Sequence, residues 1–419
     1  METDRPLTIS AQYGLVDQIE YFNKIVASKS LINYYLLNKG EFAYNKSYSN
    51  GYPFGAVKRL DNYEKGAIST LYICFDVNDK MDSDLLKEYF ETDKWYKEIY
   101  KIAVEGARNH GLLNIAVGDF FNTTHVLPTN SKEQRKLADF LIQINKKIEL
   151  LNKKYQDYQD FKKYLMQQIF AQKLRFKNFD DEWVQVKLKD IVERVKRKNT
   201  DLNSNLVLTI SAEHGLINQE EFFNKIVASK SLKDYYLIKN GEFAYNKSYS
   251  HGYPYGAIKR LDNYSQGVLS SLYICFKPTK VNSDFLKEYF ETNFWHKEIY
   301  SIAVEGARNH GLLNININDF FNTKHYIPPS YEEQEEIAKF FKMFNLKINS
   351  INNELDLAKN FKKGLLQQMF IYFYIYSKIL KYHNLIQRYK TFFRCVFLYF
   401  FHNTFFISIF FYNETKNIH

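Results

Sequence analysis

Two segments of the chain carry apolar residues at alternating spacings of four and three, which is the pattern of a coiled-coil helix. In the first segment these residues are Leu137, Leu141, Ile144, Ile148, Leu151, Tyr155 and Tyr158. In the second they are Ile337, Phe341, Phe344, Ile348, Ile351, Leu355 and Ala358. The pattern predicts two long helices that can bury their apolar seams against each other. Ser131 with Gln134, and Tyr331 with Gln334, stand at the expected starts, and Ser131 predicts a capping box.

The segment before each helix has a different pattern. Short apolar and aromatic runs such as FAYNKSY and LYICF alternate with the breakers NGYPFG and HGYPYG. Runs of this kind, bounded by Gly, Asn and Pro, predict short strands joined by turns. The expected fold class is therefore α+β, with an irregular sheet in each domain and a long helix after it.

The chain is an internal duplication. Asn23–Leu31 recurs unchanged at Asn224–Leu232, an offset of 201 positions, and Ile102–Ile115 recurs at Ile302–Ile315, an offset of 200. The offset falls because one residue is missing near Lys277–Val281, in a polar loop that tolerates the change. A unit of roughly 200 residues is a domain rather than a solenoid repeat. The pattern therefore indicates duplication of a whole module.

We expect a first domain at 1–130, a first helix and linker at 131–176, a second domain at 177–330, a second helix at 331–370 and a tail at 371–419. The second copy opens with DDEWVQVKLKDIVERVKRKNTDLNSN, whereas only a few residues precede the repeated part of the first copy. The first domain is therefore expected to be N-terminally short.

The tail is rich in Phe, Tyr and Ile, where the first copy has AQKLRFKNFDDEW. Within it, Val396–Tyr412 is about as short as a membrane span can be, and it contains polar residues at 402–404. We interpret the tail as translated sequence past a disrupted reading frame, expected to be non-functional, in preference to a membrane anchor.

Charge and cysteine content add to this picture. Lys and Arg total 57 against 47 for Asp and Glu, and the net charge of +10 favours a polyanionic partner, although it also suits an ordinary soluble surface. Two of the three cysteines, Cys74 and Cys275, lie in the matching LYICF runs, where they serve as small apolar residues of strands. The N-terminus has no basic segment followed by an apolar run, so a reduced, cytoplasmic location is expected.

Motifs of nucleotide-dependent and DNA-modifying enzymes are missing from the sequence. It contains no Gly-Lys dipeptide, so it has no P-loop, and no two glycines stand two apart, so it has no G-x-G turn for a methyl donor. No proline follows Asn or precedes Asp, which removes the amino-methylation motif and the commonest nuclease motif. His and Cys never cluster at metal-ligand spacing. We expect no catalytic residues, no metal site and no cofactor.

A polar and basic cluster recurs in both copies, along a predicted strand, a Gly-Tyr-Pro turn and a second strand. Lys and Arg neutralise phosphates, Asn and Arg can bond purine edges, and Ser and Tyr hydroxyls reach backbone oxygens. The alternative is ordinary exposed strand and turn residues, with Tyr packed on the sheet and Lys solvated. After Tyr44 and Tyr245, the candidate DNA-binding residues are Asn45, Lys46, Ser47, Tyr48, Tyr52, Lys58 and Arg59, and Asn246, Lys247, Ser248, Tyr249, Tyr253, Lys259 and Arg260.

A second candidate is a loop bounded by glycines, Gly106 to Gly111 in the first copy. Glycines permit close approach of the backbone, and three successive side chains can donate to bases. The alternative is a helix C-cap in which the histidine bonds a local carbonyl. The candidate residues are Arg108, Asn109 and His110, and Arg308, Asn309 and His310.

Residues around the two helices resemble the conserved regions of type I restriction-modification specificity subunits. The matching residues at the helix starts are Glu133, Gln134, Leu137, Ala138 and Phe140, and Glu333, Gln334, Ile337, Ala338 and Phe340. The matching helix ends are Phe161–Phe170 and Phe361–Phe370, and the segments Leu174–Phe176 and Glu182–Ile191 also match. The resemblance covers about residues 1 to 370, and its double occurrence makes it specific.

This resemblance implies two tandem target recognition domains, separated and joined by two long antiparallel coiled-coil helices and related by a pseudo-two-fold axis. Each domain would read one half of a bipartite site in double-stranded DNA. The implied partners are two methyltransferase subunits, which modify adenine, and two motor-nuclease restriction subunits. Members of the family carry no active site, in agreement with the missing motifs.

Because the two domains are nearly identical, the resemblance also implies a gapped palindromic site. Asn50 against His251 and Phe54 against Tyr255 are differences in the expected reading turn that can break this symmetry. The alternative reading is a truncated or silent specificity cassette that does not assemble into an active complex.

Overall fold

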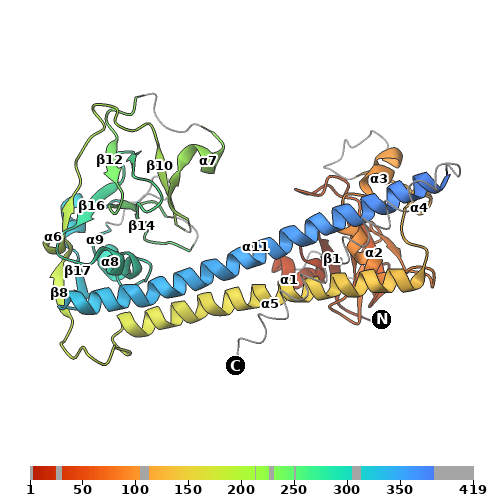
Figure 1. Cartoon of the computed structure of the whole chain (residues 1–419), viewed down its shortest axis with the longest axis horizontal. Helices are drawn as coiled ribbons and strands as arrows, with labels where there is room; N and C mark the ends of the chain where they lie inside the picture. The colour runs from red at the N-terminus through yellow and green to blue at the C-terminus, as the bar shows by residue number, and fades with distance from the viewer. Residues whose placement is uncertain are drawn as a thin grey trace. The chain divides into compact units, whose positions relative to one another are not determined.

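The computed structural model describes residues 3–24, 31–103, 113–212, 214–225, 231–249, 252–303 and 313–381 (Figure 1). The chain divides into two compact units: unit 1 is Met1–Leu151 with Glu354–His419, and unit 2 is Asn152–Asn353. This division cuts through both long helices, α5 (Ser131–Phe170) and α11 (Tyr331–Lys381). Each unit therefore contains one small domain and a half of each helix, and the expected α+β class with two long helices is confirmed.

The domain of unit 1 is built from short strands and short helices. Its elements are β1 (Pro6–Ser10), β2 (Gly14–Asp17), α1 (Gln18–Phe22), β3 (Tyr35–Asn38), β4 (Phe42–Asn45), β5 (Ala56–Arg59), β6 (Lys65–Ile68), β7 (Ile73–Phe75), α2 (Ser83–Phe90), α3 (Tyr96–Ile102) and α4 (Val117–Phe121). They form sheets of order β2-β1-β6-β3 and β5-β4-β7, antiparallel except for the pairing of β1 with β6. The expected FAYN and ICF strands are β4 and β7.

The domain of unit 2 repeats this plan with additional elements at its start. Its elements are β8 (Val184–Lys187), α6 (Leu188–Ile191), β9 (Val192–Arg194), β10 (Leu208–Ser211), β11 (Gly215–Asn218), α7 (Gln219–Phe223), β12 (Tyr236–Lys239), β13 (Phe243–Asn246), β14 (Ala257–Arg260), β15 (Gln266–Leu269), β16 (Ile274–Pro278), α8 (Ser283–Phe290), α9 (His296–Ile302), α10 (Ile317–Asn322) and β17 (Lys324–Ile327). The sheet orders are β14-β13-β16-β9, β10-β11, β12-β15 and β17-β8.

Both long helices enter the core of each unit. In unit 1, Ala138 and Leu141 of α5 and Leu366 and Phe370 of α11 are buried in one cluster with the aromatic residues of β4, α2 and α3. The Phe370 ring lies 5.1 Å from that of Tyr89. In unit 2 the buried core likewise includes Phe170 of α5 and Phe341 of α11. The apolar seams predicted from the sequence are thus buried partly against each other and partly against the domains.

The helix starts differ from the prediction by one residue. Asn130 Oδ1 accepts hydrogen bonds from the backbone N–H groups of Lys132 (2.9 Å) and Glu133 (3.2 Å), so Asn130 rather than Ser131 caps α5. Ser330 Oγ accepts from the Glu333 N–H at 3.2 Å in α11. The capping box is wrong because Gln134 is buried, where its amide donates to the Pro128 carbonyl and accepts from the Asp82 N–H.

The helix α11 continues beyond the predicted end at Phe370 to Lys381, and Phe373 packs against the core of unit 1. The first residues of the expected tail therefore belong to the fold. Among the described residues, no helix is long and apolar enough to cross a membrane, and Val396–Tyr412 lies outside them.

A buried histidine in unit 2 makes stability sensitive to acid. His325 Nδ1 lies 2.9 Å from the Tyr289 hydroxyl and Nε2 lies 2.8 Å from Thr323 Oγ1. Burial lowers the pKa of His325 from 6.5 to about 4. Because the unfolded chain takes up this proton near pH 6.5 and the native chain does not, the free energy of unfolding should fall by about 3 kcal/mol between pH 6.5 and pH 4.

This effect can be measured by urea denaturation across that pH range. In His325→Gln, the free energy of unfolding should change less steeply with pH, by about 1.4 kcal/mol per pH unit between pH 6.5 and pH 4. Above pH 7 the variant should be less stable than the native chain by a constant amount. An unchanged slope in the variant would assign the acid sensitivity to other groups.

Candidate nucleic-acid interface

The turn between β4 and β5 carries the polar cluster found in the sequence, and its first tyrosine belongs to the core. Tyr44 is fully buried, stacks on Phe120 at 5.0 Å and donates its hydroxyl hydrogen to the Phe54 carbonyl at 2.8 Å. Tyr245 makes the same bond to the Tyr255 carbonyl. Burial raises the pKa of both phenols. These two residues hold the ends of each turn together and do not face a ligand.

Residues after the tyrosine form an ordered, solvent-facing turn. Asn45 Oδ1 accepts from the Ser47 N–H at 3.0 Å, and Ser49 and Tyr52 exchange backbone hydrogen bonds of 2.8 and 3.3 Å. The Tyr48 side chain is 60% exposed. In unit 2 the bond from the Ser248 N–H to Asn246 Oδ1 is also 3.0 Å, and Tyr249 is 58% exposed. In both units the described part of the turn therefore has the same Asn–Ser hydrogen bond and an exposed tyrosine, while the Asn and Ser side chains are half-buried.

The segment that comes after the second candidate cluster contacts this turn. Arg108, Asn109, His110, Arg308, Asn309 and His310 themselves lie outside the described residues. The chain is described again two residues beyond each loop: the Leu113 N–H donates to the Lys46 carbonyl, and the Leu313 N–H donates to the Lys247 carbonyl, both at 3.0 Å. Lys46 Nζ also donates to the Ile115 carbonyl at 3.4 Å. Leu113 and Leu313 are thus hydrogen-bonded to the turns, although they are distant from them in sequence.

Partial burial changes the chemistry of one of these lysines. Desolvation lowers the pKa of Lys247, because a half-buried ammonium group is less well hydrated. Tyr52 and Tyr253 are half-buried beside the turns, and burial followed by the charge of Glu91 raises the pKa of Tyr52. Among the described side chains of residues 45–49 and 246–249, Tyr48 and Tyr249 are exposed and the others are half-buried.

The lysine and arginine of the second strand are engaged inside the domain. Lys58 is 8% exposed, and its Nζ lies 2.7 and 2.8 Å from the carboxylate oxygens of Glu91. Lys259 pairs with Glu291 at 2.7 Å. Their prediction as phosphate contacts is corrected by this burial, because a paired and desolvated ammonium group is not presented to a ligand.

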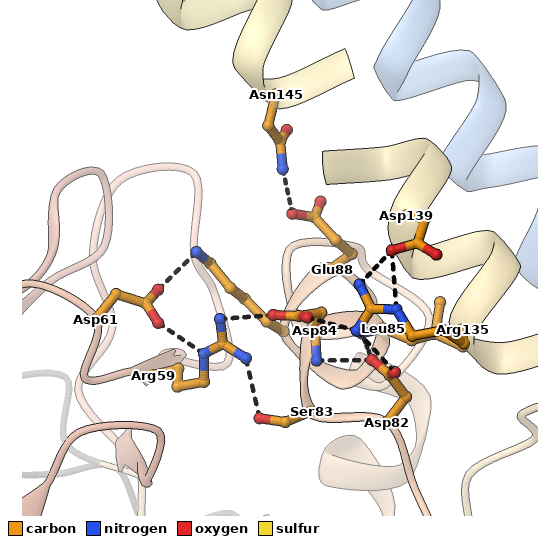
Figure 2. A network of polar contacts seen from close by, with 11 residues as sticks. Arg59, Asp61, Asp82, Ser83, Asp84, Leu85, Glu88, Arg135, Asp139 and Asn145 are labelled. Carbon is orange, nitrogen blue, oxygen red and sulfur yellow. Dashed lines mark hydrogen bonds and ion pairs between the residues drawn. The ribbon is translucent and has the colours of Figure 1, made fainter. Parts of the chain in front are cut away.

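Arg59 is held in a network of acidic residues (Figure 2). It lies 2.7 Å from Asp61 and 2.9 Å from Asp84, and it donates to Ser83 Oγ at 3.0 Å. Arg260 makes the equivalent contacts with residues 262, 283 and 284. The structure therefore assigns both arginines to internal ion pairs, and we leave them out of the interface.

The same network reaches the long helix in unit 1. Figure 2 shows Arg135 of α5 between Asp82, Asp84 and Asp139, at 3.2, 2.9 and 2.6 Å. Burial by itself would raise the pKa of Asp84. Hydrogen bonds from Arg135 and Arg59 outweigh this effect, and the pKa of Asp84 lies below its ordinary value. Residue 335, the counterpart of Arg135, is a glutamate, so the described residues of unit 2 do not repeat this ion-pair link between domain and helix.

A buried glutamate that the sequence reasoning missed ties each domain to both long helices. Glu88 of α2 is 4% exposed, accepts from Asn145 Nδ2 of α5 at 2.7 Å and lies 2.7 Å from Lys362 Nζ of α11. In unit 2, Glu288 contacts Asn345 and Lys162, both at 2.9 Å. The signal was available in the repeat, since all three residues recur at an offset of 200. This triad positions the domain that carries the turn.

The described residues contain no group of three His, Cys, Asp or Glu side chains that could hold a metal ion. The side chains of the described turns are hydrogen-bond donors and acceptors, with one exposed tyrosine ring in each unit.

No protein-family model and no curated protein matches the sequence. Three solved structures are similar to the chain. A chain of a type I R-M system, from a study of its complex assembly and conformational transition, has 13% identity and a TM-score of 0.45, and the match covers 80% of this chain and 82% of that one. The HsdS subunit from Thermoanaerobacter tengcongensis has 14% identity and a TM-score of 0.42, with coverages of 80% and 81%. The type I restriction-modification S subunit from M. genitalium has 13% identity and a TM-score of 0.46, with coverages of 79% and 82%.

Proposed function

We propose that this chain is the DNA-recognition subunit of a type I restriction-modification complex. Each unit reads one half of a bipartite site in double-stranded DNA, and partner subunits carry out adenine methylation and restriction. The resemblance of both helix starts and helix ends to the conserved regions of specificity subunits supports the proposal. The missing methyl-donor and nuclease motifs agree with a subunit that binds DNA and leaves catalysis to its partners.

The observation that carries the proposal is the repeated turn. In each unit an Asn side chain orders the turn, a Tyr ring projects into solvent, and the leucine two residues beyond the loop with Arg, Asn and His is hydrogen-bonded to the same turn. Amide and guanidinium groups can bond base edges, while Ser and Tyr hydroxyls can bond backbone phosphates. Two copies of one reading surface suit a site with two half-sites.

The near identity of the turns favours a palindromic target with an unread gap. From Phe42 to Ala56 the two copies differ only at Asn50, where the second has His251, and at Phe54, where it has Tyr255. The Phe54 ring packs on Tyr96 at 5.3 Å, so this position faces the domain. His251 lies outside the described residues. Any asymmetry between half-sites should therefore come from position 50 and its counterpart.

Genome-wide mapping of methylated adenine tests the proposal. Cells that express the chain with a cognate methyltransferase subunit should show a new gapped palindromic motif, absent from cells with the methyltransferase subunit alone. An asymmetric motif would support the DNA-recognition role and contradict the palindromic target. If no new motif appears while the chain is folded and soluble, the silent-cassette reading replaces the proposal.

The exposed tyrosine of each turn should contribute to DNA affinity. We expect Tyr249→Ala to weaken binding of the methylated motif's duplex by about tenfold, because an aromatic contact and a phosphate hydrogen bond are lost. Tyr48→Ala should weaken it equally. Tyr326→Ala is the matched control, since Tyr326 in the same unit is 53% exposed and remote from the turn in sequence. DNA affinity would be measured by fluorescence anisotropy. An equal loss of affinity in all three variants would mean that the turn does not contact DNA.

A further inference from the structure

Unit 2 contains a strand, helix and strand that complete its sheets. The β9 strand pairs with the outer edge of β16, with Arg194 opposite Phe276, and β8 pairs with β17. Figure 1 shows β8 and β17 beside α6, which connects β8 to β9. The side chains of Trp183, Leu188 and Ile191 are buried in the core of the unit.

The described residues of unit 1 include no counterpart of these three elements. The sheet order β5-β4-β7 leaves β7 as an edge strand, and the segment Thr123–Leu127, which contains the counterpart of β17, forms no strand. An edge strand presents unpaired N–H and C=O groups to which another strand can bind. We call β7 together with Thr123–Leu127 the open edge of unit 1.

Side chains at the open edge are more exposed than their partners in unit 2. Phe121 is 56% exposed, whereas Phe321 is 9% exposed. Phe276 is fully buried, whereas its counterpart Phe75 is half-buried. In three other pairs the residue of unit 1 is half-buried and its counterpart in unit 2 is buried: Thr123 and Thr323, His125 and His325, and Leu127 and Ile327. The apolar surface that β8, α6 and β9 cover in unit 2 is therefore accessible in the described part of unit 1.

A polar partner is also missing at this place. In unit 2, the Glu333 carboxylate accepts from Trp183 Nε1 at 3.2 Å and pairs with Arg175 at 2.9 Å. Glu133 of unit 1 is half-buried, and burial raises the pKa of its carboxyl group. A donor group placed like Trp183 Nε1 of unit 2 would give the Glu133 carboxylate the hydrogen bond that Glu333 has.

We propose that the open edge of unit 1 binds a polypeptide segment with the chemistry of Glu182–Val195, supplied by a partner protein. The pattern is Trp, three residues, Lys-Leu, two residues, Ile-Val, one residue and Arg. Its backbone would pair with β7 and Thr123–Leu127 as strands added to a sheet edge, and its Trp, Leu and Ile would cover Phe75, Phe121 and Leu127. This inference does not depend on the proposed DNA-binding role.

A synthetic peptide of residues 182–195 tests this with the full chain. Fluorescence anisotropy of the labelled peptide should show saturable binding, and hydrogen exchange of β7 and residues 121–127 should slow when it is bound. A peptide with Leu188→Asp should bind at least about tenfold more weakly, because Leu188 is fully buried in unit 2 and a carboxylate there is desolvated.

A pair of protein variants locates the binding. Phe121→Asp should weaken binding of the peptide by about tenfold or more. Leu150→Asp, on an exposed face of α5 in the same unit, should leave binding unchanged. Absence of binding to the folded chain, or equal binding to both variants, would overturn the proposal. So would slow exchange of β7 before peptide is added, since the edge would then already be covered by residues 382–419 or by a second copy, which light scattering distinguishes.

Discussion

Gly55→Ala combined with Gly256→Ala should abolish sequence-specific methylation and destabilise each unit by at least about 2 kcal/mol. Gly55 ends the turn between β4 and β5 with a φ of +76°, and Gly256 ends the turn between β13 and β14 with a φ of +74°. A Cβ atom at Gly55 would lie 2.0 Å from the carbonyl oxygen of Asn45, and one at Gly256 would lie 2.0 Å from that of Asn246. Because backbone atoms are in the way, the turn itself must move, and Asn45 and Asn246 are the residues that order it.

Gly51→Ala with Gly252→Ala is the matched control. These glycines have φ values of +81° and +79°, but no atom lies within 4 Å of the added Cβ. Only the cost of the left-handed backbone applies, about 1 kcal/mol, so methylation of the same motif should persist. Urea denaturation and methylation mapping would measure both effects. If the two pairs of variants behave alike, the close approach at Gly55 and Gly256 has no role in recognition.

Lys362→Met should lower the free energy of unfolding of unit 1 by about 3 kcal/mol. The substitution removes the cation 2.7 Å from Glu88 and leaves a carboxylate with a 5% exposed side chain facing Asn145 alone. A buried charge without its partner is more destabilising than loss of the pair as a whole. Since Glu88, Asn145 and Lys362 connect the domain to both helix halves, hydrogen exchange of α2 should become faster together with that of α11.

Two comparisons make the result specific. Lys363→Met changes the neighbouring, exposed lysine and should alter stability by less than about 0.5 kcal/mol. Adding Glu88→Gln to Lys362→Met should restore part of the loss, because the uncompensated charge is then removed. No recovery in the double variant would mean that the contacts of the lysine stem, rather than its charge, hold the domain.

Much of the fold was predictable because it depends on periodic patterns. The heptad positions from Leu137 to Tyr158 placed α5, and the LYICF runs placed β7 and β16, since these patterns record which face of each element is buried. The helix caps were not predictable at single-residue accuracy. Asn130 and Ser131 are both good caps, and the choice depended on Gln134 turning inward to bond Pro128 and Asp82.

The candidate site was predictable in part. Tyr48 is exposed and Ser47 is half-buried, so both stay candidates for DNA binding, whereas Lys58 and Arg59 are held in ion pairs inside the domain. Their acidic partners Glu91 and Asp84 come from α2 and its end, across the domain. A basic residue beside a polar turn looks the same in sequence whether its charge faces solvent or a buried carboxylate.

By itself the sequence determined the duplication and the two helices, because identity and periodicity are local properties of the chain. Tertiary structure alone decided that Glu88 and Glu288 connect each domain to both helices, and that Leu113 and Leu313 are hydrogen-bonded to the turns between β4 and β5 and between β13 and β14. Within the described part of the chain, it also left one edge of unit 1 open where unit 2 is covered. These outcomes depend on which distant segments share one low-dielectric interior, where the free energy of a charge or an unpaired backbone group is set by its neighbours.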